Sequence, residues 1–158
     1  MNKEKFVYSI FIDTTPEKLW GALTEGEWTQ KFWAGRYIES DFKVGSDVTM
    51  YTDSGKSKID FIGKILKSEP PTLLSYTFHV QVSEESRAEE PSVVTYEIES
   101  LKDVVKLTVI HDEIPSGLEG LSRGWTAIIS GLKSVLETGK PLSEGIWKWH
   151  EDQGYKTA

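Results

Sequence analysis

Histidine is the residue type in this sequence best suited to metal binding or proton transfer. The chain has three, His79, His111 and His150, and none stands at the i, i+4 spacing with which two histidines of one helix hold a metal ion. Cysteine is absent, which excludes thiolate metal sites and thiolate nucleophiles. We therefore expect neither a metal nor another cofactor.

Other catalytic patterns give no stronger signal. The chain contains no P-loop and no Gly-x-Gly-x-x-Gly fingerprint, which argues against nucleotide chemistry. The acidic pairs at 84–85 and 89–90 lie in a polar stretch, where no apolar surroundings would raise a carboxyl pKa toward neutrality. We interpret both pairs as solvated charges and assign no catalytic residue.

Aromatic residues form the largest set with a capacity for binding. Ligand pockets are mainly apolar with a few polar groups that orient the ligand, and Tyr76, Tyr96 and His111 could provide those groups. Two alternatives stay open: the rings could fill a core and leave no cavity, and His111 could simply tie the end of its strand to the following loop. The predicted ligand-binding residues are Trp28, Trp33, Phe61, Tyr76, Phe78, Tyr96, His111 and Trp125.

A long helix and a sheet must position these residues. Apolar residues at 125, 128, 129, 132, 135 and 136 form one stripe of a helix over 124–139. Gly139 followed by Pro141 predicts the end of that helix. The chain from about 37 to 111 is typical of β-strands, so the stripe should pack against a sheet that curves around it. Such an arrangement can enclose a ligand pocket.

The remaining elements follow from capping and alternation. A strand over 6–12 precedes Thr15, the predicted N-cap, and Pro16 at the first helical position; a second short helix should follow through Trp28 and Phe32. Residues 81–91 are polar and acidic, and we expect a loop or mobile hairpin tip there. Further strands are predicted near 36–40, 46–52, 57–67, 72–80, 92–99 and 102–111. Alternation gives the inner face three sets: Leu74, Tyr76 and Phe78; Val94, Tyr96 and Ile98; Leu107, Val109 and His111.

Size and charge limit the partners. With 158 residues, 38% of them hydrophobic, a single domain is expected over 1–142. The net charge of −7 repels phosphate backbones and anionic lipid, so nucleic acid is not an expected partner. No signal peptide and no apolar run of membrane-spanning length is present, which predicts a cytoplasmic protein without membrane insertion.

The C-terminal tail over 143–158 is expected to pack on the domain or to lie at a dimer interface. It carries Trp147 and Trp149, and aromatic residues of this kind are enriched at the centres of interfaces. A homodimer is therefore one candidate assembly. Two arginines, Arg36 and Arg123, are candidate anion-binding groups beside a pocket mouth, with an ordinary surface charge as the alternative for each.

Five segments in this order resemble the SRPBCC superfamily, within it the group named after the activator of Hsp90 ATPase. They are TPEKLWGAL at 15–23, EPPTLLSYTF at 69–78, SVVTYEI at 92–98, LTVIH at 107–111 and GWTAIISGLKSVLETG at 124–139. The resemblance covers about 6–142, without the acidic 81–91 segment and the tail. It implies an α+β helix-grip fold, as in Bet v 1-like and START-like proteins: a curved antiparallel sheet around a long C-terminal helix, with two short helices between the first two strands.

Three functions follow from this resemblance. The first is non-catalytic binding of a small apolar or amphipathic ligand between the sheet and the C-terminal helix. The second is a protein-interaction module for a chaperone or stress-response partner; the additional N-terminal domain implied for the eukaryotic activator has no room in this chain. The third is an enzyme related to the cyclases and hydrolases of the fold, with His111 or Tyr96 as proton carrier.

Overall fold

The computed structural model describes residues 3–153. Its centre is a seven-stranded antiparallel sheet with the strand order β1-β7-β6-β5-β4-β3-β2. From β2 to β7 each strand pairs with the next strand along the chain, and β1 pairs with β7. The strands are β1 (Glu4–Ile12), β2 (Tyr37–Glu39), β3 (Asp47–Tyr51), β4 (Ile59–Glu69), β5 (Leu73–Val80), β6 (Ser92–Ser100) and β7 (Val105–Ile114).

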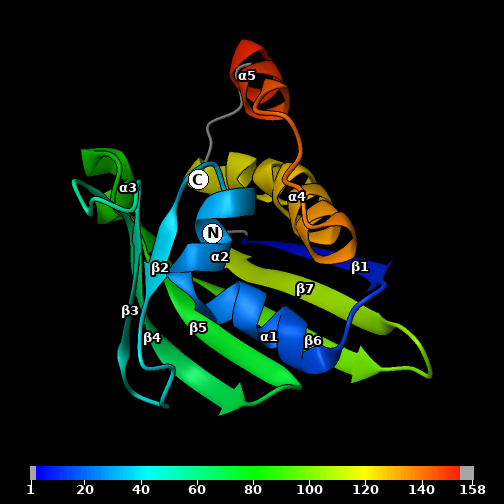
Figure 1. Ribbon diagram of the computed structural model, residues 1–158. Coiled ribbons are helices and arrows are strands. Elements are labelled where there is room, and N and C mark those ends of the chain that lie inside the picture. The colour runs from blue at the N-terminus through cyan, green and yellow to red at the C-terminus, as the bar shows by residue number, and fades with distance from the viewer. Residues whose placement is uncertain (1–2, 154–158) are drawn as a thin grey trace.

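Most of the helices lie on one face of this curved sheet, whereas the short helix between β5 and β6 stands at one end of the strands and the last helix stands beyond the sheet (Figure 1). They are α1 (Pro16–Thr24), α2 (Gly26–Phe32), α3 (Glu84–Ala88), the 3-10 helix η1 (Ser116–Arg123), α4 (Gly124–Thr138) and α5 (Gly145–Asp152). The two short helices between β1 and β2 and the long helix gripped by the sheet are confirmed. The architecture is the α+β helix-grip fold that the sequence predicts.

The predicted start of α1 is confirmed. The Lys18 amide donates to the Thr15 hydroxyl (3.3 Å), and Pro16 occupies the first turn. Helix α2 begins directly after α1 and fixes the next segment, because the Thr29 hydroxyl donates to the Arg36 carbonyl (2.9 Å) and accepts from the Ile38 amide (3.2 Å). The chain entering β2 is therefore held against α2.

Helix α4 is confirmed as the central rod of the fold. Its stripe is buried at Trp125, Ile128, Ile129, Leu132 and Val135, while Leu136 is partly buried. Gly139 ends the helix in the left-handed conformation (φ 77°), which glycine adopts without steric cost. The buried stripe faces both the sheet and the helix pair α1–α2, and α4 contacts each of them.

The alternation of the central strands is also confirmed. All nine residues predicted for the inner face of β5, β6 and β7 are buried. Tyr76 pairs with Val94, and Tyr96 pairs with Val109, so side chains of one parity stand next to each other across the sheet. Adjacent strands therefore direct a continuous apolar layer at α4.

Two expectations need correction. Residues 81–91 are not simply a loop, because Glu84–Ala88 form a short helix with a capping box in which the Ser83 and Ser86 side chains bond each other's backbone amides. That helix carries no apolar stripe, so periodicity gave no sign of it. The 3-10 helix before α4 was likewise not predicted.

The tail forms helix α5, on which Trp147 packs against the core while Trp149 is 55% exposed. Residues 154–158 of the predicted tail lie outside the described residues. Among residues 3–153, no helix has the length and apolar character needed to cross a membrane.

Candidate functional site

Seven of the eight predicted ligand-binding residues meet in one aromatic cluster between the sheet and α4. Trp33, from the end of α2, lies 5.5 Å from Trp125 of α4 between ring centres. Phe61 stacks on Phe78 (3.9 Å) and on Tyr76 (5.9 Å). Tyr96 and His111 each stand edge-on to Trp125. These seven side chains therefore lie together on the concave side of the sheet, where the sequence placed them.

The cluster fills its own space. Its most exposed member, Phe78, is only 3% exposed, and the rings contact each other directly. Four hollows found within residues 3–153 are lined by other side chains. The eighth residue, Trp28, lies apart: it is half-buried on α2, with the Lys31 ammonium 4.7 Å from the centre of its ring. Ligand contact by these eight residues stays a prediction.

His111 has a hydrogen-bond partner on each ring nitrogen. The Trp125 indole N–H donates to Nδ1 (3.0 Å), and an indole can only donate, so Nδ1 carries no proton. The neutral ring then carries its proton on Nε2 and donates it to the Ser92 hydroxyl (2.7 Å). Ser92 in turn donates to the Phe78 carbonyl (3.1 Å). The chain of donors ties β5, β6, β7 and α4 together.

This arrangement is not that of a general base. Burial lowers the pKa of His111 to about 4, so the ring is neutral at pH 7, and the neighbouring Asp112 opposes that shift only weakly. The nitrogen facing Ser92 is already protonated and does not accept the serine proton. His111 thus has the tethering role that the sequence left open as an alternative.

The hydroxyl groups of the two buried tyrosines, Tyr76 and Tyr96, form a hydrogen bond with each other. Their hydroxyls lie 3.1 Å apart, and both residues are fully buried. Burial raises the pKa of Tyr76 and of Tyr96 above the usual value, which keeps both phenols protonated. A proton carrier at this place would need a path to solvent, and full burial closes it.

Sequence reasoning overlooked one motif. Residues 120–124 read Gly-Leu-Ser-Arg-Gly, the spacing of a nucleophile elbow. In that motif the serine stands on a sharp turn between a strand and a helix. Here Ser122 lies inside the 3-10 helix η1, which runs into α4, so the required strand–turn–helix context is missing.

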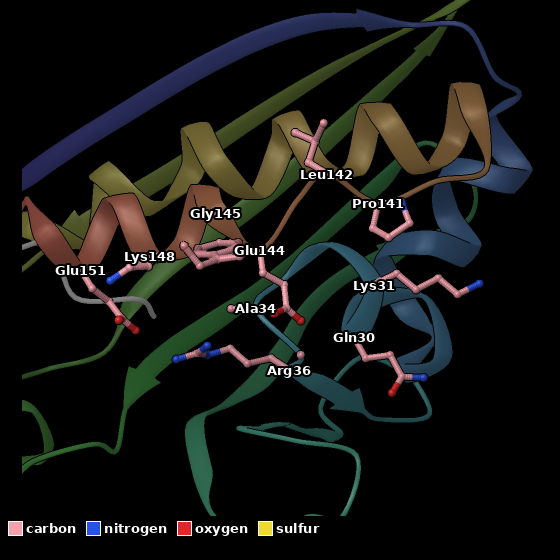
Figure 2. A pocket seen from close by; sticks show the side chains of 12 residues that line it. Gln30, Lys31, Ala34, Arg36, Pro141, Leu142, Glu144, Gly145, Lys148 and Glu151 are labelled. Carbon is pink, nitrogen blue, oxygen red and sulfur yellow. The ribbon is translucent and has the colours of Figure 1, made fainter.

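An open groove lies at the edge of the fold between α2 and α5 (Figure 2). Its volume is about 730 Å³. One wall comes from α2 and the turn after it; the other comes from α5 and the segment before it. The lining residues are Gln30, Lys31, Ala34, Gly35, Arg36, Pro141, Leu142, Glu144, Gly145, Trp147, Lys148 and Glu151.

Arg36 is the one lining residue of this groove that is both charged and buried. Its side chain is only 10% exposed, and Nε donates to Oδ2 of Asp60 at 2.7 Å. Ala34 and Gly35 precede it with positive φ angles (49° and 78°), and this turn leads from α2 into β2. The alternative of an ordinary surface charge is therefore wrong for Arg36, whereas Arg123 is exposed.

Asp60, at the start of β4, was not singled out from the sequence. It is 1% exposed, and burial raises its pKa more than the Arg36 guanidinium lowers it. Its second oxygen, Oδ1, has no hydrogen-bond partner. A pair of an arginine and an aspartate 24 residues apart has no local sequence signal, so only the fold reveals it. Across residues 3–153, no three histidine or acidic side chains gather as a metal site.

Fold and site together define a small helix-grip domain with a packed aromatic core and a lateral groove. The family model described as activator of Hsp90 ATPase homolog 1-like protein matches residues 13–137. The chain belongs to this family of the SRPBCC superfamily.

Solved structures agree with this fold. A protein of Mesorhizobium loti is 21% identical, with a TM-score of 0.70 over 84% of this chain and 96% of that one. An HSP90 activator from Plasmodium falciparum is also 21% identical (TM-score 0.69; 84% and 95% covered). The Aha1 dimer from Colwellia psychrerythraea is 19% identical (TM-score 0.67; 87% and 98% covered). A comparison with curated proteins gives no match.

Proposed function

We propose that this protein binds a small amphipathic ligand without catalysis, and that the groove between α2 and α5 holds it. The observation that carries this proposal is the groove itself. Its volume of about 730 Å³ lies within the usual range for sites that enclose a small molecule. Its lining combines apolar Pro141, Leu142 and Trp147 with charged side chains from both walls.

The absence of catalysis rests on the hydrogen bonds of the core. His111 serves as a bridge between Ser92 and Trp125, and the two tyrosines pair with each other. None of these groups among the described residues combines an unused donor or acceptor with access to solvent. Binding therefore fits the arrangement better than proton transfer.

The aromatic core predicted from the sequence is the alternative location. A ligand there would have to displace rings that now contact each other, with Phe61 and Phe78 stacked at 3.9 Å. The groove accepts a ligand without such repacking, which is why we prefer it. The following experiment separates the two locations.

The experiment uses N-phenyl-1-naphthylamine, a neutral apolar dye whose fluorescence rises in apolar surroundings. We expect saturable binding to the native protein and binding weaker by about tenfold for Trp147→Ala, which removes an apolar wall. Trp149→Ala is the matched control, because Trp149 belongs to the same helix but does not line the groove. It should bind the dye like the native protein.

The outcomes are distinct. Binding that responds to Tyr76→Phe and ignores Trp147→Ala would move the ligand into the core. Equal losses in both tryptophan variants would mean that the effect comes from α5 as a whole. No binding of the dye at any concentration would contradict the proposal.

A second function is a relation to the Hsp90 chaperone. It is favoured by the family and by the Plasmodium falciparum structure, whose description is that of an HSP90 activator and of which this domain covers 95%. The test is the ATPase rate of Hsp90 from the same organism with and without this protein. An Hsp90 ATPase rate that rises and then saturates as this protein is added supports the relation. An unchanged ATPase rate at an excess of this protein contradicts it.

A homodimer is the third element of the proposal. One similar structure is a dimer, and Trp149 of α5 is 55% exposed. Sedimentation equilibrium should give twice the monomer mass for the native chain and a weaker dimer for Trp149→Ser. A monomer at high protein concentration would contradict this assembly.

A further inference from the structure

The three cations in the lining of the groove each have a partner on this chain. A carboxylate offsets the charge of a cation beside it, and the face of an aromatic ring attracts a cation. The pairs are the Lys31 ammonium with the ring of Trp28 (4.7 Å to its centre), Arg36 Nε with Oδ2 of Asp60 (2.7 Å) and Lys148 Nζ with Oδ1 of Asp152 (3.8 Å). A negatively charged ligand would compete with partners that are already in place.

The two carboxylates of the lining, Glu144 and Glu151, are in a different situation. Both are exposed, and within residues 3–153 neither side chain has an ion pair or a side-chain hydrogen bond. Glu144 is the N-cap residue of α5, yet its carboxylate makes no capping hydrogen bond. Figure 2 shows both side chains extending from the α5 wall toward the turn after α2. The charge that the groove leaves uncompensated is therefore negative.

Trp147 lies between the two glutamates along α5. It comes three positions after Glu144 and four before Glu151, so the three side chains share one side of the helix. Trp147 is partly buried against the core and also lines the groove. An indole ring attracts an ammonium group and contacts apolar groups as well. Leu142, at 44% exposure, extends this apolar wall. Carboxylates and an apolar surface thus lie next to each other.

We infer that the groove selects amphipathic ammonium ligands: Glu144 and Glu151 attract the ammonium group, while Trp147 and Leu142 contact the apolar part. This inference rests on the proposed ligand function and names its ligand class. The net charge of −7 acts in the same direction, because it raises the concentration of cations near the chain and lowers that of anions.

The test compares three ligands with the same phenylbutyl tail: 4-phenylbutylamine, 4-phenylbutan-1-ol and 4-phenylbutanoate. At pH 7 the amine is a cation and the acid is an anion, because the pKa of an alkyl ammonium lies far above 7 and that of a carboxyl far below. Titration calorimetry of the native protein should give about tenfold tighter binding of the ammonium than of the alcohol. The carboxylate should bind most weakly.

The variant Glu144→Gln with Glu151→Gln keeps the size of both side chains and removes their charge. The preference for the ammonium should disappear in this variant, with the alcohol bound as before. The matched control is Glu84→Gln with Glu85→Gln, which removes the same charge from two exposed residues of α3 outside the groove. Its preference for the ammonium should equal that of the native protein. Circular dichroism checks that both variants are folded.

Each result has one meaning. Equal affinity of the native protein for the ammonium and the alcohol, or tightest binding of the carboxylate, overturns the selection of cations and leaves the ligand function standing. A preference that survives without the two groove carboxylates, or that disappears equally in the α3 control, also overturns this inference. No binding of any of the three ligands overturns both the inference and the proposed ligand function.

Discussion

At the scale of single residues, burial changes the pKa of His111 and with it the protonation state of the ring. The ring is 1% exposed, and each of its two nitrogens has a hydrogen-bond partner. These surroundings favour the neutral form of the imidazole. Folding therefore becomes coupled to pH through a residue that bridges Ser92 and Trp125. Burial likewise raises the pKa of the Asp60 carboxyl beside the groove.

The pH dependence of stability should reveal this coupling. The pKa of His111 is lowered from 6.5 to about 4, so below pH 6.5 the unfolded chain takes up a proton that the folded chain refuses. Stability from this residue is present above pH 6.5 and is lost as the pH falls toward 4. Between pH 6.5 and 5 the loss should be about 2 kcal/mol. Urea unfolding of the native protein at a series of pH values measures it.

His111→Gln provides the comparison for that measurement. The variant should be less stable at pH 7, because Trp125 and Ser92 lose their bonded geometry. It should also lose less stability than the native protein between pH 6.5 and 5, since glutamine does not titrate. Two parallel curves of unfolding free energy against pH would refute this account of His111.

The ion pair beneath the groove makes a second residue-scale prediction. Arg36→Met alone leaves Asp60 buried without its partner, and such a loss costs about 3 to 5 kcal/mol. The variant Arg36→Met with Asp60→Leu should regain most of that stability. Chemical denaturation of both variants checks this. A single variant as stable as the double one would show that the pair is not effectively buried.

At the scale of elements, one glycine fixes how closely β4 approaches β5. A Cβ atom added at Gly63 would overlap the backbone carbonyl oxygen of Thr77 on the neighbouring strand. Gly63→Ala should therefore force the strands apart and cost about 1 to 3 kcal/mol in unfolding free energy. Gly120→Ala is the control, because its added Cβ meets no atom within 4 Å. Equal stabilities of these two variants in urea would contradict the close approach.

Elements with a repeating or capping signal could be predicted from the sequence. The stripe of α4, its end at Gly139 and the start of α1 at Thr15 all depend on residues close together in the chain. The alternation in β5 to β7 gave the inner faces for the same reason. Helix α3 had no apolar period to reveal it, because serine caps and not core contacts define it.

The candidate site could be predicted only in part. Which rings share a face follows from alternation, but whether they leave a void depends on how seven side chains from separate elements fit together. The groove could not be predicted from the sequence for a related reason. Its walls come from residues about 110 positions apart in the chain, and the Arg36–Asp60 pair beneath it spans 24. No local pattern links such positions.

At the scale of the whole molecule, side chains fill the space between the sheet and α4, and the groove lies at the edge of the fold. Ligand bound in the groove would join α2 to α5, which otherwise belong to opposite ends of the chain. Because a ligand that binds only the folded state stabilises it, the dye N-phenyl-1-naphthylamine at 100 times its dissociation constant should add about 2.7 kcal/mol to the unfolding free energy. Urea denaturation with and without the dye measures this gain.

The most direct test of the groove is an NMR titration of the uniformly 15N-labelled native protein with N-phenyl-1-naphthylamine. The amide signals of Ala34, Arg36, Gly145 and Lys148 should shift together along one saturation curve, because these residues line both walls. The signals of Tyr76, Tyr96 and Trp125 should stay near their starting positions. Saturable shifts confined to those three core residues, or no shifts at all, would contradict a ligand site between α2 and α5.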